Sequence, residues 1–286
     1  PKLAADAYLE ALNIVPENTT VASYLIDTLH FVTTHQTGHS PYFKANCAIK
    51  SIESTYDLHK SVGDLSLSNF LIECNKIIKE NELSVDYKNT QIYRMPAKVL
   101  DCERHKSIFA NYAVIPKFCF GCIKIQIDVF QVVDLVRLFL FFDELDFLSQ
   151  NIRKCMIEMR DGVKGRYKGL VYCSSLAEAE SLLKKLRQSV ENALDSQPKF
   201  IIKRGCTEFE QAFPGYSKVA CGDNKMMTYN LDWERVEKIW DLKHSKRSFV
   251  PSPTLPGISL ADVLIIRNWF AYGQKIGDKT AGIMDL

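Results

Sequence analysis

The apolar and polar positions in the middle of the chain alternate in a way that predicts four β-strands. Isoleucines at every second position from residue 123 to 127 alternate with Lys124, Gln126 and Asp128, which indicates a strand with one buried face. Three later segments are also expected to be strands: 152–160, 167–173 and 200–206. Helices with apolar residues at helical spacing separate them at 129–148 and 176–190, the second opened by a Ser175–Glu178 capping box.

The order strand–helix–strand–strand–helix–strand predicts an α+β protein with a ferredoxin-like βαββαβ domain over residues 117–215. We expect the strand order 4-1-3-2, with a central parallel pair formed by the first and third strands and antiparallel neighbours elsewhere. This topology would bring Cys119 and Cys122 close to Cys206 at one end of the sheet. It would place Cys155 and Cys173 together at the opposite end.

The flanking segments divide into three further parts. Residues 1–35 are expected to be the end of a helical repeat, and 36–116 a mainly helical connecting region. In that region we expect a helix from Ser68 and a shorter helix capped by Asp101. Residues 216–286 are predicted to form C-terminal helices and a tail, with a Ser259–Asp262 capping box.

The first segment carries the pattern A-x₃-Y-x₂-A-x₄-P at Ala4, Tyr8, Ala11 and Pro16. This spacing resembles the second helix of a tetratricopeptide repeat and its terminal proline. The resemblance is confined to residues 1–35, and the following helix keeps Leu25 but departs from the family at Ala22, Ile26 and Leu29. It implies the C-terminal end of a helical array whose earlier part precedes Pro1. A plain amphipathic helix ending at a proline is the alternative.

Two close pairs of soft ligands lie before the first strand. Cys102 and His105 form C-x₂-H on the predicted short helix, and Cys119 and Cys122 form C-x₂-C after a spacer of thirteen residues. Two such pairs facing each other suit a tetrahedral zinc site, to which Cys206 is a further candidate. An iron–sulfur cluster, held by the four cysteines of this set, is the alternative.

The face of the predicted sheet that the helices leave uncovered carries mixed charge. A small anionic ligand would be bound there or at the strand ends by the basic residues Lys124, Lys154, Arg160 and Arg204. A solvated face with cross-strand ion pairs is the plainer interpretation. RNA-binding domains of this topology need aromatic residues on the first and third strands, and Tyr172 alone makes a poor stacking surface.

Composition narrows the function classes. The chain has 286 residues, 47% hydrophobic and 24% charged, with a net charge of +2 that gives no reason to expect a polyanionic partner. Nine cysteines without a secreted spacing pattern indicate reduced thiols or metal ligands in the cytoplasm. The most apolar run, 130–142, is shorter than the roughly 20 residues of a membrane span, and we expect a buried helix there.

These patterns favour a zinc-stabilised module that recognises a protein or peptide partner. The alternative is a metal- or thiol-dependent enzyme acting on a small anionic substrate at the edge of the sheet, and RNA binding is the third reading. We find no phosphate-binding loop, no G-x-S-x-G elbow, no H-E-x-x-H and no dinucleotide fingerprint in the sequence.

Overall fold

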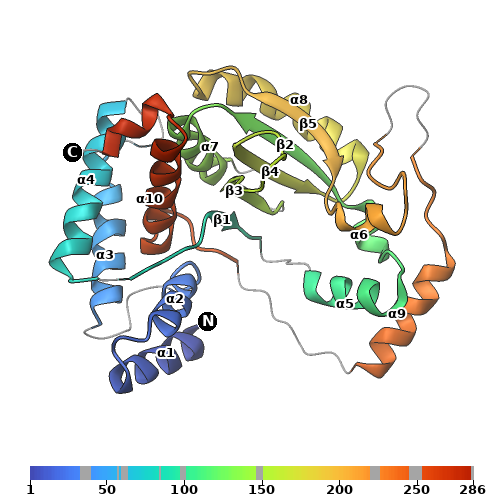
Figure 1. Ribbon diagram of the computed structural model, residues 1–286, viewed down its shortest axis with the longest axis horizontal. Helices are drawn as coiled ribbons and strands as arrows, with labels where there is room; N and C mark the ends of the chain where they lie inside the picture. Colours follow the sequence, from blue (N-terminus) through green and yellow to red (C-terminus); the bar gives the residue numbers. More distant parts are fainter. Residues whose placement is uncertain are drawn as a thin grey trace.

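The protein has an α+β architecture, with N-terminal helices, a five-stranded antiparallel sheet with interleaved helices, and C-terminal helices (Figure 1). The structure is a computed structural model. It describes residues 1–32, 40–56, 58, 64–83, 85–96, 101–145, 151–219, 226–244 and 253–284.

The α-helices are α1 Lys2–Ile14, α2 Thr19–Thr28, α3 Pro41–Glu53, α4 Asp64–Glu80, α5 Cys102–Tyr112, α6 Lys117–Gly121, α7 Val132–Glu144, α8 Leu176–Ala193, α9 Asp232–Lys243 and α10 Leu260–Lys275. The strands are β1 Gln91–Arg94, β2 Ile123–Val129, β3 Arg153–Ile157, β4 Tyr167–Cys173 and β5 Lys199–Arg204. Two 3₁₀-helices follow β5 and α10, η3 Glu208–Gln211 and η4 Lys279–Met284.

The strands lie in the order β1-β3-β4-β2-β5, and every neighbouring pair is antiparallel. The four expected strands follow the predicted order, but the predicted parallel central pair is wrong. Helix α7 connects β2 to β3 and α8 connects β4 to β5, and the two strands of each pair run in the same direction. The connection between β3 and β4 has no crossover helix, so these two strands run in opposite directions. As a result β2 runs against β4, with Ile123 opposite Cys173 and Val129 opposite Tyr167. The fifth strand, β1, extends the sheet beside β3.

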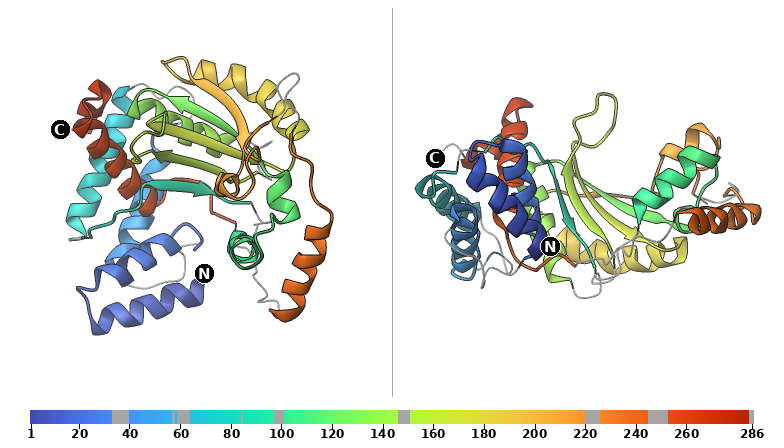
Figure 2. Two further views of the ribbon diagram at one scale, coloured as in Figure 1. Left: turned by 45° about the vertical axis from the view of Figure 1, so that its right-hand side comes forward. Right: turned by 90° about the horizontal axis from the view of Figure 1, so that it is seen from below.

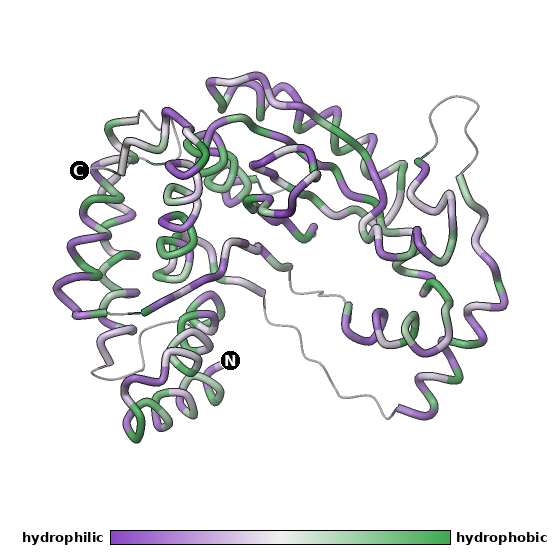
Figure 3. Tube along the Cα trace, viewed as in Figure 1, coloured by the Kyte–Doolittle hydropathy of each residue, from purple (hydrophilic) through white to green (hydrophobic). Residues whose placement is uncertain are grey.

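Helices α7 and α8 cover one face of this sheet. Gly169 of β4 allows α7 to approach closely, because a Cβ there would lie 2.4 Å from Leu138 Cδ2. Figure 2 shows α8 running along that face, with the α1–α2 pair and the α5–α9 pair at opposite sides of the sheet. In Figure 3, α7 is drawn mostly in the hydrophobic colour, whereas α8 alternates with the hydrophilic colour. The expected buried helix over 130–142 is confirmed from Val132 onward by the burial of nearly all its apolar residues, whereas Phe130 lies before the helix and is exposed.

The described residues form two hydrophobic cores. The larger core extends from α1 through the helix-covered face of the sheet to α10. The smaller core lies among α5, α6, η3 and α9 and includes Cys119, Tyr216 and Trp233. Within the described part of the chain, no helix combines the length and apolar character that crossing a membrane requires.

A buried ion network ties the edge strand to two helices. Arg94 of β1 donates to Asp143 of α7 at 2.6 Å and to Asp262 of α10 at 3.1 Å, and all three side chains are buried. Asp262 also completes the expected capping box with Ser259. Burial opposes ionisation of Asp262, but Arg94 and His30 outweigh it and hold its pKa below the ordinary value.

Replacing Arg94 by methionine should lower the free energy of unfolding by about 3–5 kcal/mol, because two buried carboxylates lose their cation. The comparison is Lys76→Met, which removes an exposed pair with Glu73 and should cost about 0.5 kcal/mol or less. Urea denaturation of both variants measures the difference. Equal stability of the two variants would contradict a central role for this network.

Candidate functional site

The antiparallel pairing brings the cysteine-bearing ends of three strands to one end of the sheet. Ile123, the first residue of β2, lies opposite Arg204 near the end of β5 and opposite Cys173 at the end of β4. The backbone N–H of Gly205 donates to the carbonyl of Cys122 at 2.9 Å. The expected proximity of Cys119 and Cys122 to Cys206 follows from this pairing.

The expected second cluster, with Cys155 and Cys173 at the opposite end, is wrong. Because β2 and β4 are antiparallel, Cys173 lies at the same end as Cys122. Cys155 lies opposite Gly169 within the sheet. Both thiols are buried in the larger core, where burial raises the pKa of Cys173 to about 12. Their role is to pack beneath α7 and α8.

Four other cysteines gather where the smaller core meets this end of the sheet, and we call them the thiol cluster: Cys102, Cys119, Cys122 and Cys206. They come from the first turn of α5, from α6, from the residue after α6 and from the turn after β5. Cys119 and Cys122 are buried, Cys206 is half-buried and Cys102 is exposed.

Burial and mutual proximity keep these thiols protonated at neutral pH. Burial, with the neighbouring Cys206 and Cys102, raises the pKa of Cys122 to about 12. Burial and Glu208 raise the pKa of Cys206 to about 11. The pKa of Cys119 is raised further, again mainly by burial. Thiolates would form here only if a cation compensated their charge.

The thiols of the cluster are the type of donor that a soft metal ion prefers. Gly205 leaves room for the Cys122 thiol, because a Cβ at this position would lie 2.3 Å from Cys122 Sγ. Thiolate sulfur is the ligand type that zinc and iron–sulfur clusters prefer. As the side chains stand, no three His, Cys, Asp or Glu residues of the described ranges are placed to hold a metal ion. Coordination of a metal would require the thiols to turn toward one another.

His105, the fifth proposed ligand, lies on α5 with its ring stacked on Phe118 at 5.8 Å between centroids. The charged groups that act on it most strongly are Arg104 and Glu237, and burial with Arg104 lowers its pKa. Its buried Nδ1 atom has no hydrogen-bond partner within the described chain. The groups that act electrostatically on Cys119, Cys122 and Cys206 include other thiols of the cluster, whereas those that act on His105 are Arg104 and carboxylates.

Lys124 and Lys154 lie on the face of the sheet that α7 and α8 leave uncovered. Lys124 Nζ donates to the carbonyl of Gly205 at 2.7 Å, beside the thiol cluster. Lys154 is only 9% exposed, and its ammonium lies 5.0 Å from the centre of the Tyr93 ring. Burial and the charge of Lys124 lower the pKa of Lys154 to about 8. Tyr93 was not predicted, because β1 is too short to give a clear alternation.

The two arginines of the predicted ligand set have other contacts. Arg160 is exposed and donates to Glu158 at 2.7 Å. Arg204 is buried between the rings of Phe120 and Tyr216 and donates to the carbonyls of both residues. Arg204 therefore ties α6 to the segment after η3.

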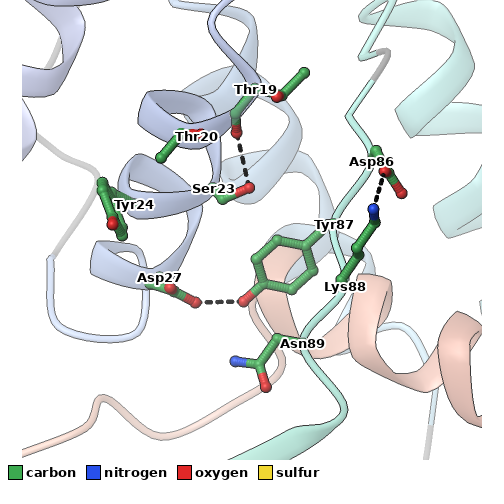
Figure 4. Close-up of a pocket in the computed structure, with 9 residues that line it drawn as sticks. All are labelled: Thr19, Thr20, Ser23, Tyr24, Asp27, Asp86, Tyr87, Lys88 and Asn89. Atoms are coloured by element: carbon green, nitrogen blue, oxygen red, sulfur yellow. Dashed lines mark hydrogen bonds and ion pairs between the residues drawn. The ribbon is translucent and has the colours of Figure 1, made fainter.

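A separate polar pocket of about 400 Å³ lies between α2 and the segment before β1 (Figure 4). Hydroxyl, amide and charged side chains line it, and the Tyr87 hydroxyl donates to Asp27 across it. Nothing in the hydrophobic pattern indicates this pocket, because its residues come from two elements that meet only in the fold.

Comparison of the chain with known protein families, curated proteins and solved structures gave no significant match. The geometry of these groups is therefore what supports a function.

Alkylation of the native protein should follow this arrangement. Cys47 is exposed and should react rapidly with iodoacetamide at pH 8, whereas Cys119 and Cys122 should react slowly, because burial denies access and suppresses the reactive thiolate. The labelling rate of Cys206 should keep rising as the pH approaches about 11. Peptide mass spectrometry measures each site, and equal rates at Cys47 and Cys122 would contradict the arrangement.

Proposed function

We propose that the thiol cluster binds one zinc ion, which stabilises a module for recognising a protein or peptide partner. The convergence of Cys102, Cys119, Cys122 and Cys206 from three separate segments carries this proposal. His105, with its unpartnered Nδ1, is the alternative fourth ligand. The same four thiols are the donor set of an iron–sulfur cluster, which remains the alternative cofactor.

Zinc would compensate the thiolates that burial otherwise disfavours. Cys102 is exposed and Cys206 half-buried, so their side chains have room to turn inward. A metal held by the cluster would fasten α5 and α6 to the ends of β2 and β5. Four protein ligands close the coordination sphere, so its role would be structural. The strand order and the two crossover helices support a ferredoxin-like reading of residues 117–215.

The helical pair α1–α2 supports the partner-binding half of the proposal. Leu3 and Ile14 are 87% and 81% exposed and lie three turns apart on one face of α1. A repeat helix stacked on α1 would cover such a face, which agrees with the tetratricopeptide-like pattern. The polar pocket beside α2 offers hydrogen-bonding groups for an extended peptide.

A second candidate is an enzyme that acts on a small anionic substrate at this end of the sheet. Lys124 and its thiol neighbours Cys122 and Cys206 favour it, because cations beside thiols suit anion binding and thiol chemistry. The raised pKa values of the thiols favour the structural role for the resting protein.

The purified protein should contain about one zinc per chain, and a strong chelator should lower its melting temperature. Cys119→Ser should lose the zinc and its sensitivity to the chelator. Elemental mass spectrometry and thermal denaturation on the same samples measure both effects.

Two matched variants separate metal loss from general destabilisation. Cys74→Ser perturbs a buried thiol of the larger core and should keep the zinc despite a lower melting temperature. Cys47→Ser changes an exposed thiol and should alter neither property. Equal zinc content in Cys119→Ser and Cys74→Ser would contradict the metal site, as would wild-type protein without metal.

Partner binding should depend on the exposed face of α1. Affinity capture with Leu3→Asp/Ile14→Asp should lose the proteins that the wild type retains, because charge opposes burial of this face. Leu242→Asp, at an 86% exposed position of α9, is the control and should retain them. Quantitative mass spectrometry compares the three captures. If the double variant captures the same proteins as the wild type, the exposed face of α1 does not bind the partner.

A further inference from the structure

The uncovered face of the sheet concentrates positive charge near the thiol cluster. Its strands contribute five lysines, one each from β2, β3 and β4 and two from β5: Lys124, Lys154, Lys168, Lys199 and Lys203. Lys124 lies directly opposite Lys203 on one side and Tyr172 on the other. Lys154 lies opposite Tyr93 and Leu170. Cross-strand neighbours share a face, so these side chains point to the same side of the sheet.

The carboxylates on this face are already engaged. Glu158 accepts hydrogen bonds from Arg160 at 2.7 Å and from Lys168 at 2.9 Å. These bonds, of which the one from Arg160 has the larger effect, lower the pKa of Glu158 to about 2. Asp128 accepts from Gln126 at 2.6 Å. Neither carboxylate makes an ion pair with Lys154.

Lys154 is thereby left as a buried cation without a counter-ion. Within the described chain its ammonium makes no hydrogen bond or ion pair with a carboxylate, and it lies over the Tyr93 ring in a cation–π contact. Lys124, Arg160 and Lys106 add repulsion, and only Glu158 opposes it. A largely buried lysine whose ammonium has no carboxylate partner reduces the stability of the folded protein. Such destabilising groups are typical of residues retained for binding.

We propose that Lys154 and Lys124 form a binding site for a phosphate group, either of inorganic phosphate or of a small phosphate monoester. Two ammonium groups match the charge of a dianion, and lysine binds phosphate as a compact point charge. Tyr93 lies opposite Lys154 on the neighbouring strand, and Tyr172 lies opposite Lys124. The ligand would lie beside Cys122 and Cys206, so the inference rests on the second candidate function and names its substrate class.

Binding of the dianion should be coupled to proton uptake. The free protein holds the pKa of Lys154 at about 8, below its ordinary value, because of burial, Lys124, Arg160 and Lys106, with Glu158 opposing. Part of the Lys154 population is therefore neutral near pH 8, and a bound dianion would restore the proton. Affinity for phosphate should consequently fall as the pH rises through about 8.

The test is isothermal titration with sodium phosphate at pH 7, against sodium chloride of equal ionic strength. Lys154→Met should weaken binding about tenfold or more. Lys199→Met is the matched control, because Lys199 is an exposed lysine of β5 on the same face, opposite Asp128. It should bind like the wild type. Phenyl phosphate in a second series distinguishes a monoester site from one that accepts only inorganic phosphate.

Thermal denaturation without phosphate supplies an independent readout. Lys154→Met should melt at a higher temperature than the wild type at pH 7, because it removes an uncompensated charge. The difference should shrink between pH 8 and 10.5, where the folded wild type has released the proton that its unfolded chain retains. A purely structural lysine would give the opposite sign. Lys154→Arg keeps the charge and should retain phosphate binding.

Phosphate that binds wild type and Lys154→Met equally, or does not bind at all, would overturn the inference. Lys154→Met that melts lower than the wild type at pH 7 would do the same. Zinc content measured on these samples keeps the two proposals separate. We expect Lys154→Met to lose phosphate binding and to retain zinc. Wild-type protein that binds phosphate but contains no zinc would support the phosphate site and contradict the proposed zinc site.

Discussion

The antiparallel pairing of β2 with both β4 and β5 is the constraint on which the rest of the structure depends. It aligns the start of β2 with the ends of its two neighbours, and so brings Cys122, Cys173 and Gly205 to one end of the sheet. A parallel β2–β4 pair would have moved Cys173 to the other end. Strand direction, more than any local motif, determines which thiols meet.

Local signals predicted the elements well. The Asp101 cap begins α5, the Ser259–Asp262 box begins α10, and the β4 pattern matches the observed strand. Such signals act within a few residues, so the sequence displays them directly. The bounds are less exact: α4 begins at Asp64, before the predicted Ser68, and β3 ends at Ile157, before the predicted residue 160.

Interactions between distant segments could not be predicted in this way. Arg94 and Asp262 are 168 residues apart in sequence, and neither position signals the other. The same holds for Tyr93 beside Lys154 and for the pocket between α2 and Tyr87. Desolvation links the two proposals, because it makes the thiolates of the thiol cluster and the ammonium of Lys154 unfavourable until a ligand of opposite charge arrives.

Titration with cobalt(II), a spectroscopic substitute for zinc, tests the central claim most directly. Thiolate ligands give a charge-transfer band in the near ultraviolet, and tetrahedral coordination gives visible absorption. The thiol cluster predicts both signals at about one cobalt per chain, with a weaker charge-transfer band in Cys122→Ser and an unchanged one in Cys155→Ser. The absence of a thiolate band, or equal bands in the two variants, would contradict a metal site at this end of the sheet.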